Sequence, residues 1–128
     1  MEGASLSRSF LLSTKLIGTH LQDANFTGAT VAGADFASAE MSGVKSGELF
    51  GVAKALPAHW IQAYDNFIGP SANLNGADLY RADLRSASLQ SARLDYANLA
   101  GAEVVAELGT SRSVDRASLI KHVSAMLK

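Results

Sequence analysis

Residues 72–104 read ANLNG ADLYR ADLRS ASLQS ARLDY ANLAG AEV, and this stretch decides the fold. Every fifth residue, beginning at Leu74, is large and apolar, and an alanine lies two positions before each of them. Such a period fits neither an α-helix, with its 3.6 residues per turn, nor a strand, whose side chains alternate every two residues. The stretch is therefore predicted to be a repeat architecture built from units of five residues.

Residues 1–43 carry the same period in a weaker form. In the two stretches together, all fifteen central positions are apolar, and twelve of the fifteen positions two before them are Ala. An amphipathic helix is the alternative, because Ala and Leu favour helices, but a constant spacing of five leaves no apolar stripe on a helix. The predicted core of the repeats consists of Leu6, Leu11, Leu16, Leu21, Phe26, Val31, Phe36, Met41, Leu74, Leu79, Leu84, Leu89, Leu94, Leu99 and Val104.

A chain that turns a corner every five residues closes a square coil after four units. One large and one small residue of each unit then face a narrow, densely packed lumen, and successive coils pair at the strand spacing of roughly 4.8 Å. The coil predicts that Leu74 stacks on Leu94 and Leu79 on Leu99. On the outside it places His20 beside Glu40, Lys15 beside Asp35, and Asp83 beside Glu103, the last a like-charged pair.

The repeated Ala-Asp/Asn-Leu-x-x pattern resembles the pentapeptide-repeat family. The resemblance covers residues 4–43 and 72–104 and implies an all-β solenoid, a right-handed quadrilateral β-helix. The Asp or Asn of the motif is present as Asn25, Asp35, Asn73, Asp78, Asp83 and Asn98, whereas Phe10, Lys15 and Arg93 depart from it.

Residues 44–71 interrupt the repeats, because the phase of the central positions differs before and after them. Leu56-Pro57, Trp60 and Gly69-Pro70 resemble a connector of some family members. We expect either a hairpin that turns at Asp65-Asn66 or a short helical turn through residues 48–53 that ends at Pro57. The connector's own apolar side, packed on the outside of the coil wall, is expected to consist of Trp60, Tyr64, Phe67 and Ile68.

Residues 105–128 are predicted to form a C-terminal helix, because Val114, Ala117, Ile120 and Val123 recur at helical spacing after the potential cap Ser113. The helix either covers the open end of the coil or pairs with a second copy of the chain in a homodimer. The whole chain, 1–128, is thus predicted to be one domain: a first array (4–43), a connector (44–71), a second array (72–104) and a helical cap (105–128).

Composition excludes several classes of function. The net charge is −1, with 11 basic and 12 acidic residues, so no general field favours nucleic acid. Cysteine is absent, which excludes thiol chemistry, and no run approaches the ~20 apolar residues of a membrane helix. The histidines lie in three separate sections with no common ligand spacing. We therefore expect a cytoplasmic protein without catalytic residues, cofactor or bound metal.

The sequence favours a non-catalytic structural or protein-interaction module with an unidentified protein partner. Aromatic and arginine side chains are the residue types that most often anchor protein partners. The alternative comes from the resemblance, since quinolone-protection members of the family act on DNA gyrase as acidic mimics of DNA. The balanced charge and short rod disfavour that alternative. The candidate partner-binding surface comprises Tyr80, Arg81, Arg85, Arg93, Tyr96 and Trp60.

Overall fold

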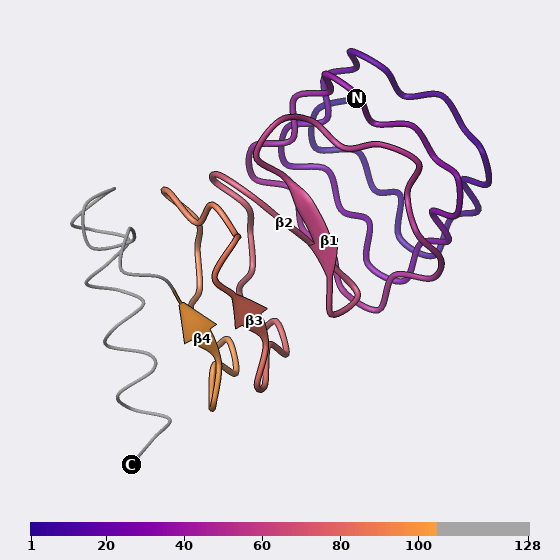
Figure 1. Cartoon of the computed structure of the whole chain (residues 1–128). Helices are drawn as coiled ribbons and strands as arrows, with labels where there is room; N and C mark the ends of the chain where they lie inside the picture. Colours follow the sequence, from indigo (N-terminus) through magenta and orange to yellow (C-terminus); the bar gives the residue numbers. More distant parts are fainter. Residues whose placement is uncertain (105–128) are drawn as a thin grey trace.

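In the computed structural model, which describes residues 1–104, the chain winds into stacked coils of twenty residues (Figure 1). The residue before each central position forms a parallel bridge to the residue twenty positions later, as Ser5 does with Asn25. The N–H of Leu6 donates to the C=O of Asn25 (2.7 Å), and the N–H of Asn25 donates to the C=O of Ala4 (2.9 Å). The predicted coil of four five-residue units is thereby confirmed.

Bridging residues stack into four outward columns, which we number in chain order. The residues of one column occupy the same position of the five-residue unit and lie on the same side of the coil. The first column is Ser5, Asn25, Lys45, Asn73 and Arg93. The second comprises Phe10, Thr30 and Phe50 in the first array and Asp78 and Asn98 in the second array; the third comprises Lys15, Asp35 and Ala55, and then Asp83 and Glu103; the fourth includes His20 and Glu40. Within residues 1–104 the bridges join the two arrays on the first column only.

In the regular coils the corners between columns are four-residue turns, whereas in the third coil the N–H of Leu49 donates to the C=O of Asp65 and the N–H of Lys54 donates to the C=O of Ala34. At the corner that begins at Leu21, the N–H of Ala24 donates to the C=O of Leu21 (3.0 Å), and Asp23 has a φ of 61°. A positive φ at the third residue is the pattern of a type II turn. The central residue and the small residue that follows the corner both point into the lumen, which explains the large-and-small rule of the repeat.

The predicted centres form the core. They are buried from Leu16 to Met41 and from Leu74 to Leu99, while Leu6 and Leu11 are half-buried at the N-terminal end. Val104 lies in strand β4 (Glu103–Val104), which pairs in parallel with β3 (Asp83–Leu84). The buried residues divide into two clusters, one for each array.

The first array continues past Gly43, so the predicted boundary at that residue is wrong. Lys45, Phe50 and Ala55 still bridge to the coil below, and the helical turn considered for residues 48–53 is not formed. The sequence conceals this third coil because the two inward positions have exchanged sizes. Val44 and Leu49 are buried in the slots of the small residue, and the partly buried Ser46 occupies the central slot between them, whereas Gly51, at the next central position of the sequence, is exposed.

A hairpin of β1 (Ile61–Ala63) and β2 (Asn66–Ile68) completes the connector. It turns at Tyr64-Asp65, with φ angles of 53° and 59°, one residue earlier than expected. Phe67 does not lie on the outer wall as expected, because the small central residues of the third coil leave room in the lumen. Its ring packs edge-on against Phe26 (5.8 Å between centroids) and Phe36 (5.2 Å).

Ile68 and Trp60 also differ from the expectation of an outer apolar side. Ile68 is fully buried in the cluster of the second array, and Trp60 is half-buried and packs against both clusters. Tyr64 remains exposed at the hairpin turn. The connector is therefore a joint that supplies core residues to both arrays.

The two arrays are joined along the first column. Lys45 bridges in parallel to Asn73, 28 residues later, and the N–H of Asn73 donates to the C=O of Val44 (3.0 Å). Away from the first column, the hairpin of β1 and β2 lies between the two arrays (Figure 1). The predicted C-terminal helix and the homodimer formed through it fall on residues 105–128, outside the described residues.

Candidate functional site

Large apolar side chains gather on one side of the solenoid. Because each coil takes twenty residues, Phe10, Thr30 and Phe50 stack on the second column, and Leu12 and Val52 lie at the corner that follows it. We call the second column and the corners on either side of it the second side. Its exposed large side chains are Phe10, Leu12, Phe50, Val52, Tyr80 and Tyr96.

Three of the predicted partner-binding residues lie on this second side. Tyr80 occupies the corner after the second column in the second array, and the Arg81 guanidinium lies 5.2 Å from the centre of its ring. Tyr96 occupies the corner before that column and is 92% exposed. An exposed aromatic ring at a positive φ, which is 63° here, is unusual for a bulky residue.

The other three predicted residues lie elsewhere. Arg93 belongs to the first column, where it bridges to Asn73. Arg85 is bound to carboxylates beside the third column. Trp60 is in contact with both core clusters, and the buried Gly69 lies against its ring. The structure therefore separates the predicted set into a surface group, a charge network and a core residue.

Sequence reasoning missed the apolar half of the second side. Phe10 and Phe50 are 81% and 61% exposed at the position where the repeat motif has Asp or Asn. The departure of Phe10 from the motif is the one feature of the sequence that indicates this apolar surface. An apolar side chain at an outward position does not add to the stability of the coil, because it remains in water. Its presence there therefore indicates a contact with another molecule.

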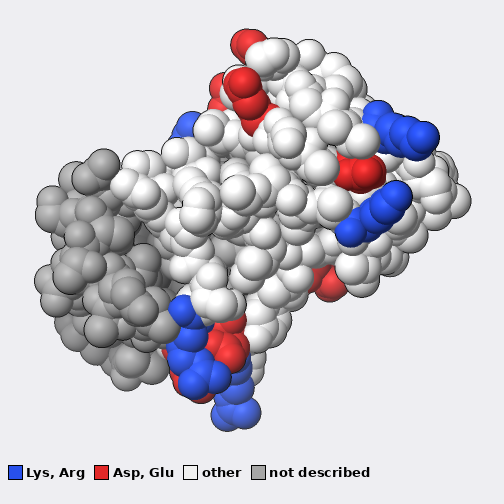
Figure 2. Space-filling model, turned by 45° about the horizontal axis from the view of Figure 1, so that its top comes forward, with Lys and Arg blue, Asp and Glu red and all other residues white. Residues whose placement is uncertain are grey.

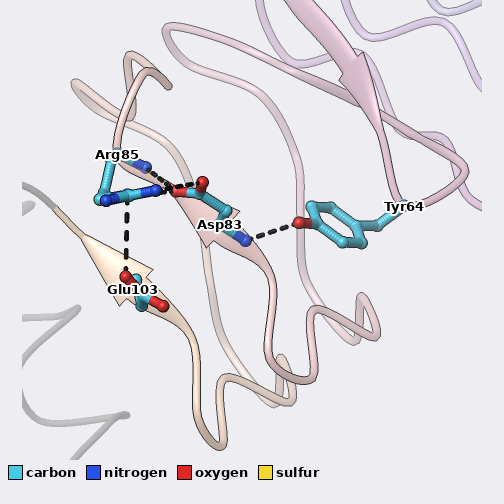
Figure 3. A network of polar contacts seen from close by, with 4 residues as sticks. All are labelled: Tyr64, Asp83, Arg85 and Glu103. Carbon is cyan, nitrogen blue, oxygen red and sulfur yellow. Dashed lines mark hydrogen bonds and ion pairs between the residues drawn. The ribbon is translucent and has the colours of Figure 1, made fainter.

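A polar network joins the hairpin to the second array on its third column (Figure 3). Arg85 donates from Nε and Nη2 to the two carboxylate oxygens of Asp83, each at 2.8 Å, and its Nε lies 3.7 Å from Glu103. The backbone N–H of Asp83 donates to the Tyr64 hydroxyl (2.7 Å). The predicted neighbours Asp83 and Glu103 are therefore bridged by a cation and do not form a bare like-charged pair.

Arg85 also controls the protonation of Asp83. Hydrogen bonds from its side chain, and then from its backbone N–H, lower the pKa of Asp83 from 3.8 to about 2. The same contact raises the pKa of Arg85 further above its ordinary value. Both side chains are exposed, so salt screens the interaction.

A cleft of about 610 Å³ opens at the corner between the first and second columns, where the hairpin separates the arrays. Its lining comes from the second and third coils, from the hairpin turn and from the start of the second array. Asn66 is 3% exposed; its Nδ2 donates to the C=O of Tyr64 (2.7 Å), and its Oδ1 has no hydrogen-bond donor. The lining residues include Lys45, Glu48, Tyr64, Asp65, Asn66, Asp78 and Tyr80.

His20 and Glu40 form another charged pair on the surface, and Gln22 also donates to Glu40. His20 Nδ1 lies 3.3 Å from Glu40, as the coil predicts. Figure 2 shows small mixed groups of acidic and basic residues separated by uncharged surface. Within residues 1–104, no three His, Cys, Asp or Glu side chains converge in a way that could hold a metal ion, and no helix is long and apolar enough to cross a bilayer.

One family model matches more than half of the chain. The family model described as pentapeptide repeats matches residues 1–31, 14–45 and 71–103, in 8 copies. No curated protein matches the chain.

One similar solved structure is HetL, a pentapeptide repeat protein involved in heterocyst differentiation regulation from the cyanobacterium Nostoc sp.. The sequence identity is 25% over 79% of the chain and 47% of HetL, with a TM-score of 0.28. The chain thus spans about half the length of HetL.

Proposed function

The chain belongs to the pentapeptide-repeat family, and from that premise we propose that it is a non-catalytic module that binds a protein partner through its second side. The observation that carries the proposal is the gathering of exposed aromatic and aliphatic side chains on one side of the coil, from Phe10 to Tyr96. Tyrosine and arginine are enriched among residues that dominate binding energy, and Tyr80 and Arg81 already lie together.

The rest of the second side fits a docking surface. Within each array the second column is held by backbone bonds between neighbouring coils, through the bridges Phe10–Thr30, Thr30–Phe50 and Asp78–Asn98, so each part of the surface is regular and rigid. A partner that covers Phe10 and Phe50 would remove apolar area from water, at about 25 cal/mol per Å². This surface supplies contact area, whereas catalysis needs converging polar groups.

Affinity capture tests this proposal. The immobilised chain would be exposed to lysate of its native host, and the retained proteins quantified by mass spectrometry. We expect two double variants, Phe10→Ser with Phe50→Ser and Tyr80→Ser with Tyr96→Ser, to lose partners that the unaltered chain retains. Since the altered side chains are exposed, each substitution should change stability by no more than about 0.5 kcal/mol.

Ile17→Ser is the matched control. Ile17 is 55% exposed, similar to Tyr80, but lies at the corner after the third column. The control should retain the same proteins as the unaltered chain. If the double variants and the control all retain identical sets, the second side is not the docking surface.

Action on DNA gyrase gains no support from the charge distribution. A DNA mimic needs a continuous acidic face, whereas the net charge is −1 and the charges visible in Figure 2 are of both signs. A supercoiling assay with purified gyrase is the direct measurement, and we expect no inhibition at micromolar protein.

The finer predictions about assembly and location belong to the same proposal. We propose a right-handed, cytoplasmic solenoid that does not bind nucleic acid and whose C-terminal helix covers the coil end or forms a homodimer. Sedimentation of the full chain and of a variant with Val114→Asp and Ile120→Asp tests the dimer. A dimer that persists in the variant would contradict pairing through that helix.

A further inference from the structure

We propose that the cleft between the two arrays binds an extended basic segment of a partner protein, which pairs as a β-strand with the backbone at Asp78. The proposal rests on the proposed function only in taking the chain to be a protein-binding module. It adds a second site with a defined chemistry, an anionic cleft with an open strand edge.

The open edge results from the way the arrays are joined. On the first column, the ladder runs through the Lys45–Asn73 bridge. On the second column, Phe50 bridges down to Thr30 and Asp78 bridges up to Asn98, and within residues 1–104 no bridge joins Phe50 to Asp78. The ladder is therefore interrupted on this column.

The backbone of Asp78 shows what is left unpaired. In the coil above, the N–H of Asn98 donates to Ala77 (2.8 Å) and its C=O accepts from Leu79 (2.9 Å). Asp78 lines the cleft, and its own N–H and C=O have no backbone partner in the described part of the chain. An unpaired strand edge is a template for an added strand.

The charge of the cleft selects a basic segment. Three carboxylates, those of Glu48, Asp65 and Asp78, line the cleft beside one ammonium group, that of Lys45. Lys45 Nζ is itself 3.5 Å from the C=O of Asn75. The excess of negative charge in a concave site attracts cations and orients their approach.

Two further groups suit a lysine or arginine side chain. Tyr64 lines the cleft, and its ring provides a face for a cation, whereas the Tyr80 ring already has the Arg81 guanidinium 5.2 Å from its centre. Asn66 contributes a buried acceptor, Oδ1, that lacks a donor, whereas buried polar atoms are nearly always paired. Lys and Arg bring donors and no acceptors. Asn66 is one of the residues that line the cleft, so this unpaired acceptor belongs to the cleft wall.

Fluorescence anisotropy with labelled peptides tests the site on the full chain. The probe is Lys-Val-Lys-Val-Lys-Val, and the comparison peptides are Glu-Val-Glu-Val-Glu-Val, the basic peptide with N-methylated backbone, and lysine amide. We expect the basic peptide to bind at least about ten-fold more tightly than each comparison ligand at low salt. Amide NMR should show shifts at Asp78 and Tyr80 on binding.

Charge-neutral variants locate the binding. Asp65→Asn combined with Asp78→Asn should weaken the basic peptide about ten-fold, since each exposed charge contributes up to about five-fold. Asn preserves the local turn, because Asp78 Oδ1 accepts from Tyr80 N–H (3.2 Å) in the same way as Asn73 Oδ1 accepts from Asn75 N–H (3.2 Å). Asp35→Asn is the matched control: its Oδ1 accepts from Ala37 N–H (3.0 Å), and it lies outside the cleft.

The control should bind the basic peptide like the unaltered chain. Equal affinity for the acidic peptide, the N-methylated peptide or lysine amide would overturn the proposal, and so would an equal loss in Asp35→Asn. These outcomes leave the second-side proposal intact, because that one is tested separately by the substitutions at Phe10 and Phe50, which do not line the cleft. Conversely, if the variant with Phe10→Ser and Phe50→Ser captures the same partners as the unaltered chain and also binds the basic peptide, the result supports the cleft and contradicts the second-side proposal.

Discussion

At the scale of single residues, the contact between Asp83 and Arg85 predicts a measurable titration. The folded-state pKa of Asp83, about 2, lies below its ordinary value of 3.8. The contact therefore stabilises the folded state at pH values above about 4, and this contribution is lost as the pH falls toward 2. We expect the NMR titration of the Asp83 carboxyl group to have its midpoint near pH 2 at low salt.

Arg85→Gln is the control for that titration. It removes the cation whose hydrogen bonds lower the pKa, so the midpoint should move up toward the ordinary value. High salt should move it in the same direction in the unaltered chain. A midpoint that is the same with and without Arg85 would show that the contact does not form in solution.

The ring of Trp60 explains why the connector has a glycine, Gly69, before Pro70. A Cβ at this position would overlap the ring of Trp60, which packs against both core clusters. Gly69→Ala should therefore lower the free energy of unfolding by about 1–3 kcal/mol, as overpacking does. Thermal denaturation measures this, and the double variant with Trp60→Leu should recover part of the loss. Additive effects would mean that the ring is not the obstacle.

At the scale of elements, the hairpin of β1 and β2 depends on Phe67. Its ring is fully buried against Phe26 and Phe36, so Phe67→Ala should cost about 3–5 kcal/mol in urea denaturation. Tyr64→Phe removes a hydroxyl at the exposed turn of the same hairpin and should cost about 1 kcal/mol. Similar losses in both variants would contradict the core role of Phe67.

The same elements show where prediction from the sequence reaches its limit. The period in residues 72–104 was sufficient for the coil, its register and its core, because each unit contacts its neighbours at a constant distance along the chain. The third coil escaped recognition since Ser46 and Gly51 hold central positions and Leu49 fills a small slot. The ring of Phe67, 16 or more residues away in the sequence, fills the space that these small residues leave in the core. A local sequence pattern cannot predict a contact between residues so far apart.

At the scale of the whole molecule, the two arrays have separate cores linked by one ladder and one hairpin. Leu84→Asp would place an unpaired charge in the lumen of the second array, where Leu84 is fully buried. In a repeat protein, stability is roughly a sum over neighbouring units. We therefore expect hydrogen exchange to show lost protection in residues 71–104 and retained protection between Leu21 and Met41.

The matched control is Arg81→Ala, an exposed change in the neighbouring unit, which should leave exchange in both arrays nearly unchanged. Loss of protection throughout the described chain in Leu84→Asp would mean that the arrays fold as one cooperative body. Unaltered protection in both arrays would show that Leu84 does not face the lumen.

The candidate sites were predictable only in part. Tyr80, Arg81 and Tyr96 were selected by residue type, and the coil places all three on the second side. Phe10 and Phe50 lie forty residues apart in the sequence and share one column only because two coils separate them. The cleft had no signal in the sequence, since its lining comes from coils before and after the hairpin and from the hairpin itself.

By itself, the sequence determined the repeat unit, the twenty-residue coil, and which Leu, Phe and Ala side chains face inward, because these follow from short-range sterics repeated at a constant period. Only the tertiary structure decided that the first array has a third coil and that the arrays meet along the first column. It also decided that the hairpin leaves a strand edge open at Asp78. These features arise from contacts between residues far apart in the chain, whose sizes compensate one another in space and not in sequence.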